Sequence, residues 1–301
     1  MRMFKQKYGV VWWLGVGGCL ALAVGCQSEP RNYWPEAIAT LDPTVILDVP
    51  LNQPMNVTIN GAFHARMGFD SGQSIAVMVN PTFAAEMKLP VVGHASASDG
   101  KTAHGASIDV IQVDSITVEN AVFPNVQGIV LDSTRSGINQ RGSLGFPLFE
   151  TCLLTLDFPH NRLIARAGEL PSGGEPAILP YTLEQNLPVI EMTIADQRMS
   201  ALVDSGSDEG IVLPKAYAER VPLNGPLRSA GHLETLFNTM QLWKADLKGE
   251  VHIGEIVLRN PTLTFTDGFD QPEIGKAFLK NYAVTFDQKN RRLRITSGSS
   301  E

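Results

Sequence analysis

The segment Phe69-Asp70-Ser71-Gly72 recurs later in the chain as Val203-Asp204-Ser205-Gly206. In each copy an apolar stretch runs into a carboxylate, a small hydroxyl residue and a glycine. A single Asp-Ser-Gly triplet is ordinary turn chemistry, because Asp bonds its own backbone and Gly accepts positive φ. The two aspartates lie 134 positions apart in matching surroundings, which indicates more than two unrelated turns.

The segments around the two copies repeat as well. An alternating stretch precedes each copy, at 55–59 and 189–194, and a proline followed by an Ala-Glu pair comes after each. Further on, Ser143-Leu144-Gly145 corresponds to Glu273-Ile274-Gly275 at an offset of 130. A duplicated unit of about 120 to 130 residues accounts for these matches.

Strand patterns dominate both halves of the chain. Residues 108–118 alternate between apolar and polar side chains, as half-buried strands do. The best helical signals, at 81–89 and 214–221, are about two turns long and begin with proline, which the first helical position tolerates. With 44% hydrophobic residues, the chain is predicted to form an all-β fold with a substantial core and short helices.

The N-terminus has the composition of a secretory signal. Positive charges at Arg2, Lys5 and Lys7 precede an apolar run that is short for a membrane span, which needs about 20 residues. The run ends in Leu22-Ala23-Val24-Gly25-Cys26, which resembles the lipobox of bacterial lipoproteins. This resemblance implies lipidation of Cys26 and a place in the cell envelope, anchored to the membrane through the lipid. A plain cleaved signal with an incidental cysteine is the alternative.

We expect six segments from the N- to the C-terminus: a signal at 1–26, a tether at 27–43, a first lobe at 44–167, a linker at 168–187, a second lobe at 188–296 and a polar tail at 297–301. Gln27 resembles the residue that sorts lipoproteins to the outer membrane, facing the periplasm, in cells that have one. After removal of the signal, Cys152 has no cysteine partner, and its apolar surroundings predict a buried thiol.

Charge and motifs exclude several functions. The net charge is −7, with 24 basic against 31 acidic residues, which argues against a nucleic-acid partner. The segment after Asp204 fails as a calcium loop, because Gly206 and Glu209 occupy positions that need a ligand and a glycine. Among the six histidines, His94 and His104 share a glycine-rich loop, which leaves a metal-binding pair as an alternative.

Two Asp-Ser-Gly loops, each followed about 70 residues later by Leu144-Gly145 or Ile274-Gly275, resemble the aspartic peptidases of the retropepsin type. The resemblance covers most of residues 44–296. It implies two tandem closed β-barrel lobes in one chain, with the active site at their interface. A fused pair of lobes needs no second copy of the chain, so we expect a monomer.

The resemblance also implies the site residues. Asp70 and Asp204 would form the catalytic pair, and one carboxyl keeps its proton because two close carboxylates cannot both ionise cheaply. The other would activate a water that hydrolyses a peptide bond in an extended peptide or protein substrate, with no metal or cofactor. Which aspartate is the base stays open. Four residues would support the pair: Ser71 and Ser205 by hydrogen bonds across the lobe junction, and Gly72 and Gly206 by close backbone approach.

One feature departs from the family pattern. The family usually has Ala or Ser after Asp-Ser-Gly, where this chain has Gln73 in the first copy and Ser207 in the second.

Segments 93–107 and 224–239 are candidate flaps over a substrate, and surface hairpins without a role are the alternative for both. The rival function is a lipoprotein that binds a peptide or envelope component on the same scaffold without cutting it.

Overall fold

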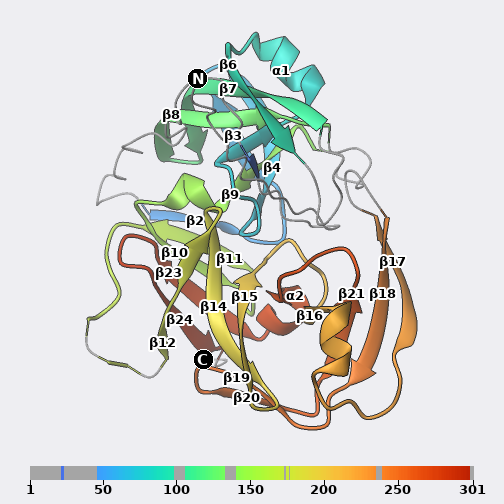
Figure 1. The fold of residues 1–301 in the computed structure, drawn as a ribbon. Coiled ribbons are helices and arrows are strands. Elements are labelled where there is room, and N and C mark those ends of the chain that lie inside the picture. Colours follow the sequence, from blue (N-terminus) through green and yellow to red (C-terminus); the bar gives the residue numbers. More distant parts are fainter. Residues whose placement is uncertain are drawn as a thin grey trace, which may run out of the picture.

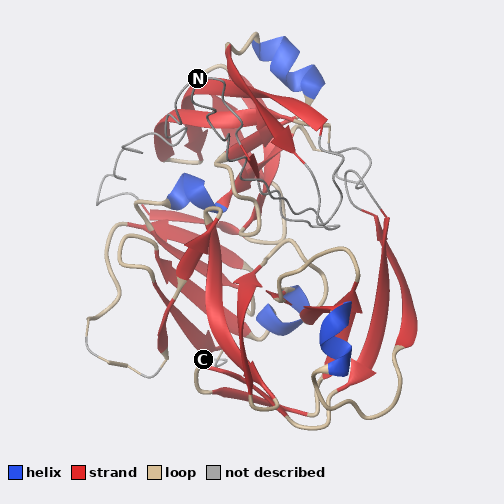
Figure 2. Cartoon of the chain, in the orientation of Figure 1, coloured by secondary structure: helices blue, strands red, loops and turns tan. Residues whose placement is uncertain are grey.

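The computed structural model describes residues 22–23, 46–97, 106–132, 140–172, 174–175, 177–234 and 239–298. Strands make up most of these residues, and the helices are short (Figure 2). Helix α1 (Pro81–Met87) starts at Asn80, whose side chain accepts a hydrogen bond from the Phe83 backbone N–H at 2.7 Å. The expected all-β fold is confirmed, and it contains two barrel lobes.

The first half of the chain forms a closed barrel of six strands (Figure 1). The strands pair in the order β7-β3-β4-β9-β5-β8, and β8 pairs back with β7. Their bounds are β3 (Met55–Ile59), β4 (Phe63–Asp70), β5 (Val77–Val79), β7 (Ala106–Val118), β8 (Ala121–Val130) and β9 (Gly142–Gly145). Outside the ring, β6 (Val91–Ala97) pairs with β7, and β1 (Leu22–Ala23) pairs with β6.

The second half repeats this order of elements with interrupted strands. Its elements are β13 (Thr182–Glu184), β14 (Leu187–Ile194), β15 (Gln197–Val203), β16 (Ile211–Pro214), η3 (Lys215–Glu219), β17 (Arg228–Glu234), β18 (Thr239–Asp246), β19 (Glu250–Ile253), β20 (Ile256–Arg259), β21 (Thr262–Thr266), β22 (Glu273–Ile274) and α2 (Lys276–Leu279). Strand β15 corresponds to β4, β22 to β9, and the hairpin β17–β18 to β6–β7.

The second lobe keeps the same order of pairings, but the two longest strands of its ring are interrupted. Strands β18 and β19 together correspond to the continuous strand β7, and β20 and β21 together correspond to β8. The breaks fall at Gly249, which has φ of +148°, and at Asn260, which has φ of 48°. Pro261 follows and has no N–H to donate to a strand ladder. These residues therefore interrupt the strands, while the pairings β14–β19, β18–β21 and β19–β20 correspond to those that close the first barrel.

A third sheet joins the two halves below the first barrel (Figure 1). Its order is β12-β24-β23-β10-β11-β2, with β2 (Ile46–Pro50), β10 (Leu153–Asp157), β11 (Arg162–Arg166), β12 (Ile178–Pro180), β23 (Tyr282–Asp287) and β24 (Arg292–Ser297). At its centre β10 pairs with β23, and Thr155 lies opposite Thr285. These two threonines are equivalent in the repeat, so an approximate two-fold axis passes between them.

The central threonines offer a test of the contact between β10 and β23, where the two halves of the chain join. Their hydroxyl oxygens lie 2.9 Å apart. Thr155→Val or Thr285→Val alone should each cost about 1 kcal/mol of stability, because the remaining hydroxyl loses its partner. The double variant should cost less than the sum of the two. Urea denaturation of the four proteins measures this coupling, and additive effects would show that the hydroxyls do not stabilise the joint.

The segment predicted as a linker, 168–187, contains β12 and β13 and is attached to the shared sheet. The Leu170 N–H donates to Asp287 Oδ2 at 2.9 Å, and Arg292 forms an ion pair with the same oxygen at 2.8 Å. Burial raises the pKa of Asp287, but hydrogen bonds from Asn290, Leu170 and Arg292 outweigh it and hold the pKa below its usual range. The boundary between the lobes stays a prediction, since both halves share this sheet.

Several N-terminal predictions fall outside the described residues. Apart from β1, the signal at 1–26, with Cys26, and the tether at 27–43 lie there, as does the tail from 299 onwards. No helix in the described parts of the chain is long and apolar enough to cross a membrane. Cys152 is 3% exposed, and burial raises the pKa of its thiol to about 12.

Candidate active site

The two Asp-Ser-Gly loops meet where the barrels face each other. Asp70 is the last residue of β4, and Asp204 follows β15 directly. In each loop the aspartate accepts a hydrogen bond from the glycine two residues on: Gly72 N–H to Asp70 Oδ1 at 2.8 Å, and Gly206 N–H to Asp204 Oδ1 at 2.7 Å. This turn chemistry fixes each carboxylate at the end of a central strand.

The serines connect one loop to the other. Ser71 N–H donates to Ser205 Oγ at 2.8 Å, and Ser205 N–H donates to Ser71 Oγ at 2.8 Å. The Ser71 hydroxyl in turn donates to the Val203 carbonyl at 2.9 Å. Ser71 is fully buried and Ser205 is 7% exposed. These hydrogen bonds align the two loops across the junction.

Each loop packs against an apolar-glycine segment from the same lobe. Strand β4 pairs in parallel with β9, so Asp70 lies beside Gly145. A Cβ atom at Gly145 would overlap the backbone oxygens of Ile75 and Gln73. At Gly275 a Cβ atom would lie 2.5 Å from the Glu209 carbonyl oxygen. Both positions therefore require glycine for close backbone approach.

The carboxyls of Asp70 and Asp204 lie close enough for Asp204 to act on the ionisation of Asp70. Asp204 is 1% exposed. Asp70 as a whole is half-buried, and its carboxyl lies in the interior. Burial of this carboxyl, as the larger cause, and the negative charge of Asp204, as the second, raise the pKa of Asp70 well above its usual range. The backbone N–H of Gly72 and the charge of Lys276 oppose this rise. The arrangement favours one shared proton between two carboxyls.

Residues 55–148 match the family model described as aspartyl protease. This segment contains the first Asp-Ser-Gly loop and the glycine that packs on it. It covers about a third of the chain and ends before the second lobe. No curated protein matches the chain. The match supports the aspartic peptidase class, and the second Asp-Ser-Gly loop lies outside it.

A third carboxyl, missed by the sequence analysis, lies beside the second Asp-Ser-Gly loop. Glu273 is 3% exposed and lies beside Asp204 and Ser207. Burial, then the charge of Asp204, raises the pKa of Glu273 well above its usual range. A signal was present in the sequence, because the repeat places Glu273 where the first lobe has Ser143.

Gln73 departs from the usual sequence of the aspartyl protease loop, but its side chain points into the first lobe. It is 2% exposed, its amide donates to the Ile75 carbonyl at 2.9 Å, and its carbonyl accepts from the Ser143 hydroxyl. Ser207 and Glu273 form the equivalent contact in the second lobe. In the first lobe the longer side chain, Gln73, is on the loop and the shorter one, Ser143, is on the adjacent strand. In the second lobe this order is reversed, with Ser207 on the loop and Glu273 on the strand.

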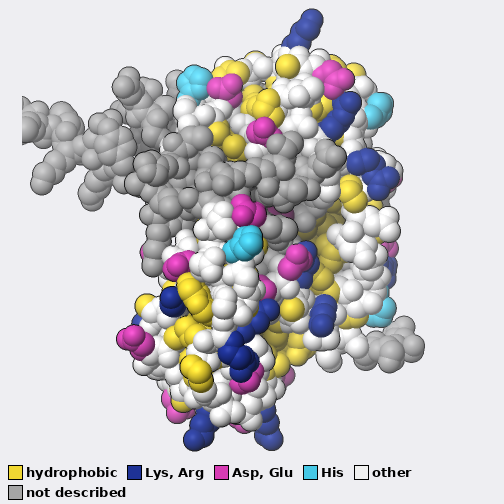
Figure 3. Space-filling model, turned by 90° about the vertical axis from the view of Figure 1, so that its right-hand side faces the viewer, with side chains coloured by type: hydrophobic (Ala, Val, Ile, Leu, Met, Phe, Trp, Pro, Cys, Tyr) yellow, Lys and Arg dark blue, Asp and Glu magenta, His cyan; other side chains and the backbone are white. Residues whose placement is uncertain are grey.

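The acids that follow Asp204 are paired with lysines. Asp208 Oδ1 lies 2.6 Å from Lys276 Nζ, and Glu209 Oε2 lies 2.8 Å from Lys244 Nζ. Glu209 also accepts a hydrogen bond from Thr264 at 2.7 Å. Figure 3 shows acidic and basic side chains interspersed over one face of the molecule.

The candidate flaps are hairpin arms. The first is β6–β7, and its tip at 98–105, including His104, lies outside the described residues. His94, on β6, lies 3.0 Å from Asp109. The second is β17–β18 along the edge of the second lobe (Figure 1), and residues 235–238 at its tip lie outside as well.

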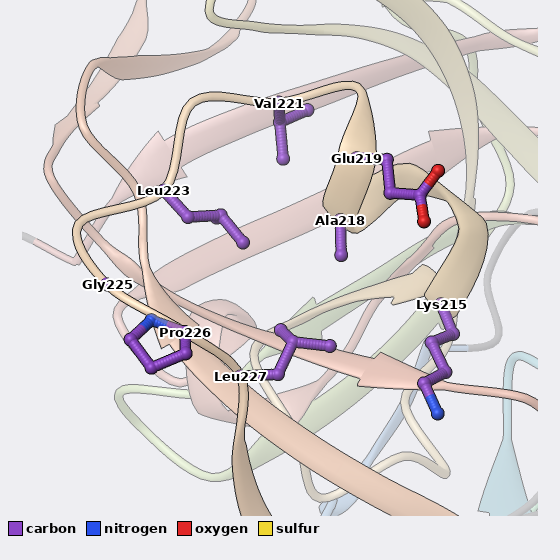
Figure 4. Close-up of a pocket in the computed structure, with 8 residues that line it drawn as sticks. All are labelled: Lys215, Ala218, Glu219, Val221, Leu223, Gly225, Pro226 and Leu227. Carbon is purple, nitrogen blue, oxygen red and sulfur yellow. The ribbon is translucent and has the colours of Figure 1, made fainter.

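A pocket of about 370 Å³ lies between η3 and the start of β17 (Figure 4). Its lining is Lys215, Ala218, Glu219, Val221, Leu223, Gly225, Pro226 and Leu227. None of the carboxyls at the lobe junction lines it, so it is separate from the candidate active site.

Three carboxyls with shifted pKa values, those of Asp70, Glu273 and Asp287, make stability depend on pH. The pKa values of Asp70 and Glu273 are raised, so the folded chain binds more protons than the unfolded chain above about pH 4, and stability should fall as the pH rises from there. The lowered pKa of Asp287 acts oppositely, and its contribution is lost as the pH falls below about 4. Denaturation between pH 3 and 8 should therefore show maximal stability at mildly acidic pH. A maximum at pH 8 would contradict the raised pKa values.

Proposed function

We propose that the chain is an exported, lipid-anchored aspartic endopeptidase whose catalytic pair is Asp70 and Asp204. The observation that carries the proposal is the meeting of Asp70 and Asp204 on two loops that reciprocal serine hydrogen bonds join. The aspartyl-protease match over the first loop adds support. A protein that only binds a ligand has no need for two buried carboxyls held against each other, since burying them is costly.

The pair can hydrolyse a peptide bond without a covalent intermediate. One carboxylate takes a proton from a water as its oxygen bonds to the peptide carbonyl carbon, and the neutral carboxyl gives its proton to the carbonyl oxygen. The resulting diol then breaks down. The first carboxyl protonates the leaving nitrogen as the C–N bond breaks, and the second regains a proton from a diol hydroxyl. Both groups return to their starting charge.

The proposed substrate is an extended peptide segment lying between the lobes. In this proposal the hairpin arms β6–β7 and β17–β18, one from each lobe, cover the substrate. Covering a substrate excludes water and strengthens the electrostatic interactions in the site. The exposed side chains along β17 suit a hairpin that moves to admit the substrate.

Cleavage of a mixed peptide library between pH 4 and 7 tests this function. We expect cuts at positions that share a side-chain preference, and protection of the protein against heat by a pepstatin-type transition-state mimic. A folded sample that cuts nothing and gains no stability from the mimic would favour the rival function, a binding lipoprotein on the same scaffold.

The proposed anchor is tested separately. Cys26→Ala should abolish incorporation of a labelled fatty acid and release the chain from the membrane fraction of expressing bacteria, because the lipid supplies the membrane affinity. Cys152→Ala is the matched control and should leave labelling intact, since that thiol is buried. Labelling that persists in Cys26→Ala would contradict the lipoprotein proposal.

A further inference from the structure

We propose that Glu273 is a positioning residue that keeps its proton and donates it in a hydrogen bond to Asp204, which makes Asp204 the ionised base and Asp70 the protonated acid. This inference rests on the proposed function and answers the question that the sequence left open. It concerns a residue outside the repeated Asp-Ser-Gly motif.

The fold places Glu273 directly beside the second loop. Strand β22 runs between β15 and β16, with Glu273 opposite Leu202 on one side and Val212 on the other. The Asp204 N–H donates to the Ile274 carbonyl at 2.9 Å, which fixes the register of the two segments. Both carboxyls are almost completely buried, at 3% for Glu273 and 1% for Asp204.

The neighbours of Glu273 favour its neutral form. Besides burial, the groups with the largest effect on its ionisation are Asp204, the Ser207 hydroxyl and Asp70, and none of these is a cation. Two lysines of the same lobe form ion pairs with other acids, Lys276 with Asp208 and Lys244 with Glu209. A buried carboxyl without a cation keeps its proton well above its ordinary range, and burial raises the pKa of Glu273 accordingly.

The first lobe has no equivalent proton donor. At the matching positions the Ser143 hydroxyl donates to Gln73, and the amide of Gln73 donates to the Ile75 carbonyl. The approximate two-fold symmetry of the pair is therefore broken on the Asp204 side.

This asymmetry assigns the two catalytic roles. A hydrogen bond donated to a carboxylate stabilises its charged form. Asp204 accepts one such bond from the Gly206 N–H, and in this proposal it accepts a second from the adjacent Glu273 carboxyl. Asp70, which shares its proton with Asp204, then holds that proton and delivers it to the substrate carbonyl. Glu273 keeps its own proton through the cycle, so the proton balance of the reaction is unchanged.

Carboxyl titration by carbon-13 NMR tests the charge states without reference to activity. The full chain is labelled at the Asp and Glu carboxyl carbons, and Glu273→Gln, Asp70→Asn and Asp204→Asn assign the signals. We expect Glu273 and Asp70 to remain protonated at pH 5 while Asp204 is ionised. Titration of Glu273 near its ordinary value of about 4.3, or an ionised Asp70 beside a protonated Asp204, would overturn the inference.

Kinetics test the positioning role. Glu273→Leu removes the donor and should lower kcat about 10- to 100-fold, whereas Glu273→Gln, whose amide can still donate to Asp204, should recover part of this loss. In Glu273→Leu the acidic limb of the pH–rate profile should move to higher pH, because the ionised form of Asp204 has lost a hydrogen bond. An unmoved acidic limb would overturn the positioning role.

The two proposals fail separately. A chain that shows the expected titration but cuts no peptide would refute the proposed peptidase function, and the proposed charge states of Glu273, Asp204 and Asp70 would stand. A chain that cuts peptides while Glu273 titrates normally would refute only the role of Glu273.

Discussion

Replacement of Asp70 or Asp204 by asparagine is expected to lower kcat by about 10³-fold or more. Each carboxyl transfers a proton in both halves of the proposed reaction, and an amide cannot transfer a proton in either half. The two losses should be similar, and the double variant should be little worse than either single one, because the pair acts as a unit. Steady-state cleavage of a peptide identified in the library measures this. Retained cleavage in one variant would remove that aspartate from the mechanism.

The asparagine variants should fold. Asparagine has nearly the shape of aspartate and can still accept the hydrogen bond from Gly72 or Gly206, and the substitution removes repulsion between buried carboxyls. Their melting temperatures should therefore equal or exceed that of the parent chain. Asp196→Asn is the matched control: Asp196 is exposed in the turn between β14 and β15 at φ of 70°, a conformation that asparagine tolerates. It should change kcat less than about two-fold, as expected for a surface site.

Alanine at Gly145 is expected to unfold or severely destabilise the first lobe, at a cost of about 3 kcal/mol or more. The added Cβ would overlap the carbonyl oxygens of Ile75 and Gln73, and these are backbone atoms that cannot rotate away. The Gly145 N–H also donates to the Ala76 carbonyl at 3.0 Å, so the strand cannot shift without losing that bond. Denaturant unfolding of the variant measures the loss.

Two further variants make this a controlled comparison. Gly275→Ala tests the equivalent contact in the second lobe, where the added Cβ would lie 2.5 Å from the Glu209 carbonyl oxygen. Gly174→Ala is the matched control, because nothing lies within 4 Å of a Cβ at that position. It should change stability by no more than about 0.5 kcal/mol. Equal stability of Gly145→Ala and Gly174→Ala would show that the close approach at Gly145 is not rigid.

Local patterns predicted the secondary structure well. The alternation in 108–118 became part of β7, and Pro81 begins α1 after the capping Asn80. The helical signal at 214–221 formed only the short 3-10 helix η3. Breaks in the second barrel were not predicted, although Gly249 and the Asn260-Pro261 pair lie in the sequence where they occur. A glycine or proline indicates a turn, but it does not show that the turn interrupts one long strand of a barrel.

The sequence by itself determined the duplicated all-β plan. Strand alternation and turn residues are patterns of neighbouring positions, and the repeat is visible when the two halves of the sequence are compared. It also pointed to Asp70 and Asp204, since each stands in a copied motif. Only the tertiary structure decided how the two copies meet. The pairing of Thr155 with Thr285 and the contact of Glu273 with Asp204 join residues 130 and 69 positions apart. Such contacts depend on strand register and on burial that the whole fold creates, and no local pattern encodes either.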